Sequence, residues 1–321
     1  MGAVLDIVFP VFALIGIGYV LGRSPLLAGE AGIKALTNFV FYAAIPAMMF
    51  RLFSRGVPHD VDWSIVLAYF GAALLHYAAT VMLGRYVFRN PAVEYGLMGM
   101  SSTFSNTALM GIPLIHTAFG EPGMIPIMMI ISFHPTVLIT LSTVLAEMTR
   151  GAAGSGGARK SMPQILLASL KSLAVHPVIL GLVAGIAFAQ TGLAMPSMVD
   201  QVISKLAAAA PPAALCALGA SLTQFRIAGD LKESMTLAMM KLLALPALVY
   251  VFTAHVFQVE PLYVAVATVN AATPAGINAF LLARYYGTYT QRSASVILLS
   301  MVFSIVTLSL VIAWFKSGLP S

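Results

Sequence analysis

Two apolar stretches of this 321-residue chain are each interrupted by amide, hydroxyl, glycine and proline residues. Amides and hydroxyls can hydrogen-bond to a polar ligand, while glycine and proline break helices. The pattern therefore predicts a ligand site built on two broken helices. The candidate residues are Ser105, Asn106, Thr107, Gly111, Pro113, Asn270, Thr273, Pro274 and Asn278.

Each interruption offers the start of a half-helix. Thr273 is placed to cap such a start and Pro274 to occupy its first turn, where a missing N–H costs nothing. Asn106 or Thr107 can cap the other half-helix, and Gly111 and Pro113 weaken the helix beyond them. Two such starts would aim free N–H groups and positive dipole ends into one cavity, which suits a carboxylate. No acidic residue lies in either interruption, so the favoured ligand is an anion.

The same residue types also have structural interpretations. Ser101, Ser102 and Thr103 are best read as small residues that let helices pack closely, and Ser105 is kept as a contact. The three asparagines at the interruptions are favoured as ligand contacts over structural hydrogen bonding, because amides inside an apolar layer are costly.

Ionisable residues within apolar segments need separate weighing. Lys241 either extends to the membrane interface or balances the charge of a bound anion, and the sequence leaves both open. His76 and His134 could relay protons, but a lone histidine in a helix bundle is more often a hydrogen-bonded structural residue. Glu94 suits the start of a helix through its interaction with the dipole. The six histidines are scattered and no HExxH motif occurs, so no metal site or other cofactor is predicted.

Composition identifies the elements that must position these residues. With 60% hydrophobic residues, 9% charged residues and a mean hydropathy of +0.93, the chain is expected to be an all-α polytopic membrane protein. A span needs roughly 20 apolar residues. Ten ranges meet this need, at about 4–21, 33–53, 63–88, 93–118, 123–147, 173–190, 200–222, 233–257, 261–284 and 293–315.

The basic residues predict how the chain is oriented. With both termini outside, the cytoplasmic loops hold twelve of the 17 Lys and Arg residues, so the positive-inside rule favours a multi-pass protein of the cytoplasmic membrane with N-out and C-out topology. These twelve are Arg23, Lys34, Arg85, Arg89, Arg150, Arg159, Lys160, Lys171, Arg226, Lys232, Arg284 and Arg292. The net charge of +6 is therefore a topology signal, and no basic, aromatic-rich face for nucleic acid is present.

An internal repeat divides the chain into two five-span halves. Val8-Phe-Pro-Val11 recurs as Val175-His-Pro-Val178, which is an offset of 167. Residues 1–149 form the first half and residues 163–321 the second, joined by a Gly/Ser-rich cytoplasmic linker at 150–162. The stretch 162–174 is amphipathic and suits the membrane surface. Because five is odd, two such halves must be inverted relative to each other, and paired interruptions in inverted halves are typical of secondary transporters.

At the interruptions the sequence resembles the auxin efflux carrier family, which includes plant auxin exporters and bacterial malonate-type carriers. Asn106-Thr-Ala-Leu-Met-Gly-Ile-Pro-Leu114 matches the family pattern N-T-x-x-M-G-I-P-L. Asn270-Ala-Ala-Thr-Pro-Ala-Gly-Ile-Asn-Ala-Phe280 is similar to its A-A-x-P-x-G-I-x-x-F pattern. Weaker similarity covers nearly the whole chain.

The resemblance implies two inverted five-helix repeats whose fourth and ninth helices are broken and cross at the substrate site. It further implies a scaffold of helices 1, 2, 6 and 7, a transport domain of helices 3–5 and 8–10, homodimers formed through the scaffold, and an elevator-like movement. The long hydrophilic loop of the plant exporters is absent here. His76 stands where plant members place an acidic and a basic support residue, so we carry it as a further candidate near the site.

The function expected from these observations is secondary transport of a small organic anion. The candidates are a dicarboxylate such as malonate and an auxin-like acid, and the protein would contact substrate, membrane lipid and a second copy of itself. Proton or sodium coupling and uniport stay open at this point. A channel-like anion pore is the alternative, and an intramembrane enzyme built on His76 or His134 with a serine is a more distant one, so no enzyme activity is expected.

Overall fold

The computed structural model describes residues 2–27, 29–56, 61–150 and 162–318. Across these residues the chain is helical apart from short turns, and its β-type pairing is an isolated antiparallel bridge between Ser105 and Ala275. The predicted all-α class is therefore confirmed for the described residues. Residues 151–161, which make up most of the predicted linker, lie outside them.

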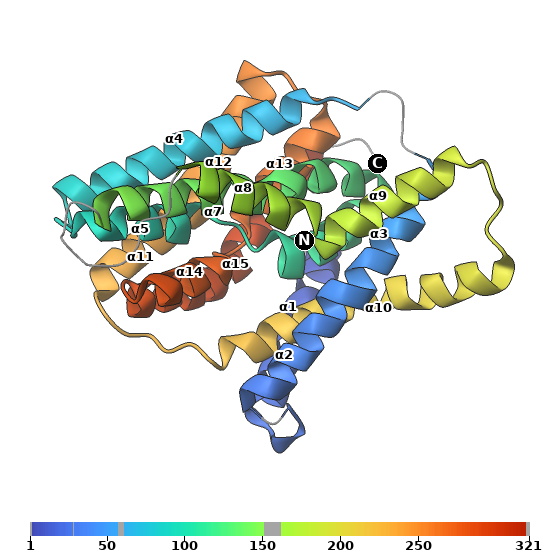
Figure 1. The fold of residues 1–321 in the computed structure, drawn as a ribbon, viewed down its shortest axis with the longest axis horizontal. Helices are drawn as coiled ribbons and strands as arrows, with labels where there is room; N and C mark the ends of the chain where they lie inside the picture. The colour runs from blue at the N-terminus through green and yellow to red at the C-terminus, as the bar shows by residue number, and fades with distance from the viewer. Residues whose placement is uncertain (1, 28, 57–60, 151–161, 319–321) are drawn as a thin grey trace.

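Two groups of helices pack together, each drawn from both halves of the chain. The first helix group has α1 packed against α10, and α3 packed against both α9 and α10. Its elements are α1 (Gly2–Arg23), η1 (Pro25–Leu27), α2 (Gly29–Phe39), η2 (Val40–Ala44), α3 (Ile45–Phe53), α9 (Pro177–Gln190) and α10 (Ser197–Leu222). Figure 1 shows α3 and α9 toward the right of the molecule, α2 at its lower middle, and α10 running from the middle to the right.

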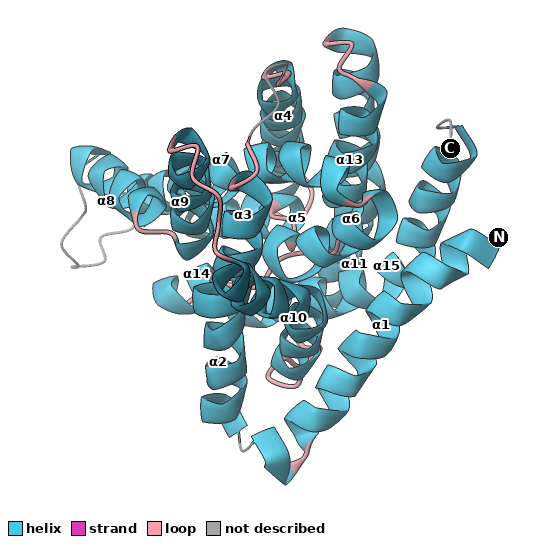
Figure 2. Ribbon diagram, turned by 90° about the vertical axis from the view of Figure 1, so that its right-hand side faces the viewer, coloured by secondary structure: helices cyan, strands magenta, loops and turns pink. Residues whose placement is uncertain are grey.

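The second helix group contains both interrupted segments. Its main contacts join α4 to α5 and α12, α5 to α7, α11 to α15, and α12 to α13. Its elements are α4 (Ser64–Tyr86), η3 (Ala92–Glu94), α5 (Tyr95–Thr103), η4 (Thr107–Gly111), α6 (Ile112–Phe119), η5 (Glu121–Gly123), α7 (Met124–Arg150), α11 (Leu231–Met239), η7 (Met240–Ala244), α12 (Leu245–Tyr250), η8 (Val251–Val256), α13 (Pro261–Ala272), α14 (Asn278–Tyr286) and α15 (Thr290–Gly318). The groups meet where α15 packs against α1 and where α6 packs against α1 and α10 (Figure 2).

Length and composition of the helices fit a membrane protein. Among the described residues, seven helices are long and apolar enough to cross a bilayer, and three shorter apolar helices accompany them. Each of the ten ranges predicted as spans falls on helical segments; two are interrupted near their middle, and the range 173–190 crosses the turn between α8 and α9. An additional helix, α8 (Met162–Ala174), coincides with the predicted amphipathic stretch and packs against α7.

Large apolar side chains cover the outer faces of several helices. Phe9, Val20, Leu67, Val302 and Leu310 each have more than 60% of their surface exposed. A water-soluble monomer rarely exposes so much apolar surface, whereas hydrocarbon chains of a bilayer are a suitable neighbour.

Both predicted interruptions are present. The helix α5 ends at Thr103 and η4 begins at Thr107, while α13 ends at Ala272 and α14 begins at Asn278. In the first segment the helix resumes at Thr107, and Gly111 and Pro113 lie just beyond the break, where the sequence predicts a weakened helix. Pro113 lies in the first turn of α6, directly after the wider π-turn η4, where its missing N–H is accommodated.

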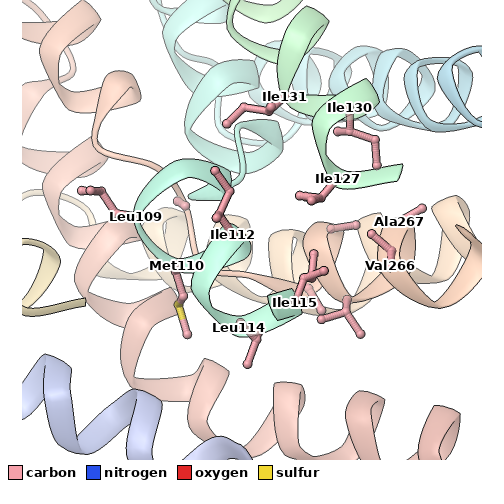
Figure 3. Close-up of a cluster of buried hydrophobic side chains, with 14 of the residues drawn as sticks. Leu109, Met110, Ile112, Leu114, Ile115, Ile127, Ile130, Ile131, Val266 and Ala267 are labelled. Carbon is pink, nitrogen blue, oxygen red and sulfur yellow. The ribbon is translucent and has the colours of Figure 1, made fainter. Parts of the chain in front are cut away.

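Apolar packing holds the second half of the first broken segment in the core. Figure 3 shows Ile112 and Ile115 of α6 on the side of Ile127 of α7, with Val266 and Ala267 of α13 close to Ile115, while Leu109 of η4 points the other way. These side chains are buried to 5% exposure or less. Buried apolar side chains thus hold the helical segment that follows the break in place.

Close backbone contact joins α1 to α10. A Cβ added to Gly219 would lie 1.9 Å from the carbonyl oxygen of Ile15, and a Cβ added to Gly18 would lie 2.1 Å from that of Cys216. Only glycine permits such an approach, as in other membrane helices that pack through small residues.

We predict that Gly219→Ala lowers the melting temperature of the purified protein, because its methyl group meets backbone that cannot rotate away. The expected cost is about 1–3 kcal/mol. Gly16→Ala is the matched control, since a Cβ at Gly16 meets nothing within 4 Å. Equal melting temperatures for the two variants, measured in the same detergent, would contradict the prediction.

Candidate functional site

The two interruptions cross and satisfy each other's backbone. The N–H of Asn106 donates to the carbonyl of Pro274 at 3.0 Å, and the N–H of Gly276 donates to the carbonyl of Phe104 at 2.8 Å. These bonds flank the bridge between Ser105 and Ala275. Non-helical backbone is thereby paired inside the protein, as the interior of a membrane requires.

Side chains complete the pairing at the crossing. The Ser300 hydroxyl accepts the N–H of Ala275 at 3.0 Å, and His134 Nε2 accepts the N–H of Ser105 at 3.4 Å. The His134 ring also packs on Phe104, with ring centroids 4.5 Å apart. His134 is therefore a structural acceptor here, which is the interpretation that the sequence favoured.

A cavity of about 150 Å³ adjoins the crossing. Its walls come from both interruptions, from α7, and from α2, η2 and the residue before α9 in the first helix group. The lining residues are Thr37, Phe41, Phe104, Ser105, Asn106, Thr107, Ala108, Leu109, Ile131, His134, Pro135, His176, Gly276, Ile277, Asn278 and Leu281. None of them is acidic. We call this space the crossing cavity.

Two half-helix starts face the crossing cavity. Thr107, Ala108 and Leu109 form the first turn of η4, while Asn278 begins α14, and all four line the cavity. First-turn N–H groups have no acceptor within their own helix and carry the positive end of the dipole. The sequence predicts two such helix starts at one cavity, and an anion as their ligand stays a prediction.

Capping does not follow the prediction. Thr273 was expected to cap the second half-helix, but its hydroxyl donates to the carbonyl of Asn270 at 2.7 Å, at the end of α13. Pro274 lies in the extended break and not in the first turn of α14, which is preceded by Ile277. Asn106 precedes η4 without forming a side-chain cap. The cap expectation is therefore wrong for both segments.

Because no side chain caps η4, two polar side-chain atoms at its start have no hydrogen-bond partner in the described protein. Asn106 Nδ2 and Thr107 Oγ1 are buried and have no hydrogen-bond partner among the described residues. Both residues line the crossing cavity. Buried polar atoms are nearly always paired, so unpaired polar atoms on residues that line a cavity suggest that a ligand completes them.

Lys241 ends at the crossing. Its Nζ donates to the carbonyl of Ala271 at 2.5 Å and to Ser105 Oγ at 3.0 Å, and the side chain has no exposed surface. The interpretation that it extends to the interface is therefore wrong. No Asp or Glu in the described part of the chain forms an ion pair with it. Lys241 does not line the cavity itself, and Ser105 connects the two.

Asn270 and His76 form hydrogen bonds with other protein groups near the crossing. Asn270 Nδ2 donates to the Tyr69 hydroxyl at 3.0 Å, and a Cβ added to Gly111 would lie 2.8 Å from Asn270 Oδ1. Glycine at 111 thus lets the two broken segments approach. His76 bonds to Thr103 Oγ1 at 3.0 Å and to the carbonyl of Met240 at 3.2 Å. Neither Asn270 nor His76 lines the crossing cavity.

A buried ionic cluster ties together the ends of three helices. Arg292 on α15 pairs with Glu94 before α5 and, at 2.9 Å, with Glu233 on α11. The Tyr289 hydroxyl donates to Glu233 at 2.6 Å, and burial and the charge of Glu233 hold the Tyr289 pKa well above its usual value. Glu94 thus forms a buried ion pair in addition to its interaction with the helix dipole. The sequence alone did not indicate this pair.

Comparisons with known proteins agree with this architecture. A family model described as "Membrane transport protein" matches residues 3–312. A "Putative malonate transporter" of Rhizobium meliloti is 28% identical over 319 residues, covering 99% of this chain and 98% of that protein. An uncharacterized transporter of Methanocaldococcus jannaschii is 22% identical over 312 residues, covering 95% and 97%.

Helices with apolar outer faces, crossed breaks and a family match over nearly the whole chain define a multi-pass membrane transport protein. The chain belongs to the membrane transport protein family, which is the auxin efflux carrier family. The resemblance stated from the sequence is confirmed.

We predict that Arg292→Gln strongly destabilises the protein, because it leaves two buried carboxylates without their cation. Breaking one side of a buried pair costs about 3–5 kcal/mol. Adding Glu94→Gln and Glu233→Gln to Arg292→Gln should recover much of the loss of melting temperature. A triple variant that melts below Arg292→Gln would show that the cluster is not held by charge.

Proposed function

We propose that the protein is a secondary transporter that moves a small organic anion across the cytoplasmic membrane. The observation that carries the proposal is the buried amine of Lys241, one hydroxyl away from a cavity without acidic walls. Burying a charge without a partner is costly. A carboxylate bound in the crossing cavity would supply the missing negative charge.

The other groups at the cavity support the same ligand. Two helix starts, the Asn106 amide and the Thr107 hydroxyl offer donors, and the cavity of about 150 Å³ suits a molecule of a few heavy atoms. A short dicarboxylate such as malonate fits better than a bulky auxin-like acid. The relative described as a malonate transporter supports this choice for the present chain.

We further propose ten spans in two inverted five-helix repeats, with both termini outside. The first helix group, which corresponds to helices 1, 2, 6 and 7, would be the scaffold and dimer interface. The second group would be the moving domain of an elevator-type mechanism. This division is supported by the packing of each group and by the crossing cavity, whose walls come from both.

The closing test of the function is counterflow in proteoliposomes. Wild-type protein loaded with unlabelled malonate should accumulate labelled malonate transiently, and uptake should saturate. Flux that rises linearly with concentration would instead identify a channel. A screen of other carboxylates by thermal shift would follow, because a ligand that binds the native state stabilises it.

We predict that Asn106→Ala weakens carboxylate binding roughly 5- to 150-fold, the range expected for losing a buried polar contact. Its melting temperature without ligand should stay close to wild type, since Asn106 Nδ2 makes no hydrogen bond within the described protein. Asn270→Ala is the contrasting variant, because it removes the bond to Tyr69 and should lower the melting temperature. Unchanged affinity in Asn106→Ala, measured by isothermal titration, would refute the contact.

We also predict that Lys241→Gln impairs uptake of a dianion more than uptake of a monoanion. Removing one positive charge takes away more attraction from the larger negative charge. The control is Lys232→Gln, an exposed lysine at the start of α11. An equal loss for both substrates, compared as kcat/KM, would mean that Lys241 acts on structure and not on charge.

A further inference from the structure

A second cavity, of about 300 Å³, lies between the two helix groups at a distance from the crossing. Its lining residues are Met48, Arg51, Leu52, Arg55, His116, Glu121, Met124, Ser204, Ala207, Ala208 and Pro211. They come from α3 and α10 in the first group and from the corner of α6, η5 and α7 in the second. We call this space the arginine cavity.

The two cavities lie at different depths along the same two helical segments. From Thr37 to Met48 the α2–α3 segment advances roughly 16 Å, and from Thr107 to His116 the broken segment advances roughly 14 Å in the same sense. Buried apolar residues such as Ile45 and Leu114 fill the intervening length. The cavities are therefore separated by a packed layer at the boundary between the helix groups.

The arginine cavity carries the right groups for a carboxylate. Arg51, Arg55 and His116 line it, and a guanidinium fork can bind both oxygens of a carboxylate. Among the residues that the structure describes, each arginine pairs with an acidic residue. Arg51 Nε bonds to Asp200 at 3.2 Å, and Arg55 Nη1 lies 3.7 Å from Glu121 Oε1.

These two ion pairs differ in the helix groups that they join. Arg51 on α3 and Asp200 on α10 belong to the same group, so their pair is internal. Arg55 follows α3 and Glu121 lies in η5, so their pair bridges the two groups. It is also longer and more exposed, with side-chain exposures of 56% and 58%. An exposed pair of this kind contributes little stability and can exchange partners readily.

We propose that the arginine cavity is a second anion site, where the carboxylate cargo docks on Arg55 in place of Glu121. This inference rests on the proposed function, because it takes the cargo to be a carboxylate. Docking would neutralise Arg55 and release the ion pair that bridges the two helix groups. The cavity would thus receive the cargo at a different depth from the crossing cavity, at the boundary between the two helix groups.

The proposal makes opposite predictions for the two partners of one ion pair. Arg55→Gln removes the docking cation and should raise the KM for malonate roughly tenfold from the side that this cavity faces. Glu121→Gln removes the competing carboxylate and should lower that KM. A pair with a purely structural role would change the KM in the same direction in both variants.

The experiment uses full-length protein in proteoliposomes of determined sidedness. Labelling of Arg55→Cys by an impermeant maleimide, in a Cys216→Ala background, identifies the side that the cavity faces. Arg284→Gln is the matched control, because Arg284 pairs with Glu30 at 4.0 Å between the same two groups but does not line this cavity. Melting curves of each variant report on folding.

Three results decide the inference. A raised KM in Arg55→Gln and a lowered KM in Glu121→Gln, both confined to the cavity side, support it. Changes of the same sign in both variants, or changes equal to those in Arg284→Gln, overturn it while leaving the proposed function standing. Absence of counterflow in the wild type with malonate and with every other carboxylate screened refutes the proposed function itself, and this inference with it.

Discussion

Backbone pairing between the two breaks is the constraint on which the site depends. A single helix that opened in an apolar environment would expose N–H and carbonyl groups at a cost of several kcal/mol each. Here Asn106 pairs with Pro274, and Gly276 pairs with Phe104. Neither break is tolerable without the other. The positions of α5, α6, α13 and α14 are consequently linked, and with them the donors that face the crossing cavity.

Much of this arrangement is visible in the sequence because helix-breaking residues are rare inside apolar segments. The two breaks, the helical class and the helix at Met162–Ala174 all follow from residue type and periodicity. Capping was predicted less well. Thr273 has a cap-forming side chain, but it bonds back to Asn270 because the extended segment after it is paired with the other break. Tertiary contact overrode the local preference.

What the sequence could not supply is the set of partners from distant segments. Thr37 and His176 line the crossing cavity from the first helix group, and Tyr69 supports Asn270 from α4. Spacing indicates which residues share a span but not which face of that span meets another. The depth of Lys241 was open for the same reason, since a flexible side chain reaches either the interface or the core. The partners of Arg292 lie roughly 60 and 200 residues away and carry no local signal.

The contact between α1 and α10 has a mechanical consequence. Where Gly18 and Gly219 lie, one backbone touches the other directly, with no side chains between them. Side chains can change rotamer and so absorb small displacements, but a main-chain contact has no such compliance. Sliding one helix along the other would drive a neighbouring Cβ into a carbonyl within a single residue step. The helices α1 and α10 therefore move together as one rigid unit. Any displacement between the two helix groups must occur at contacts between longer side chains.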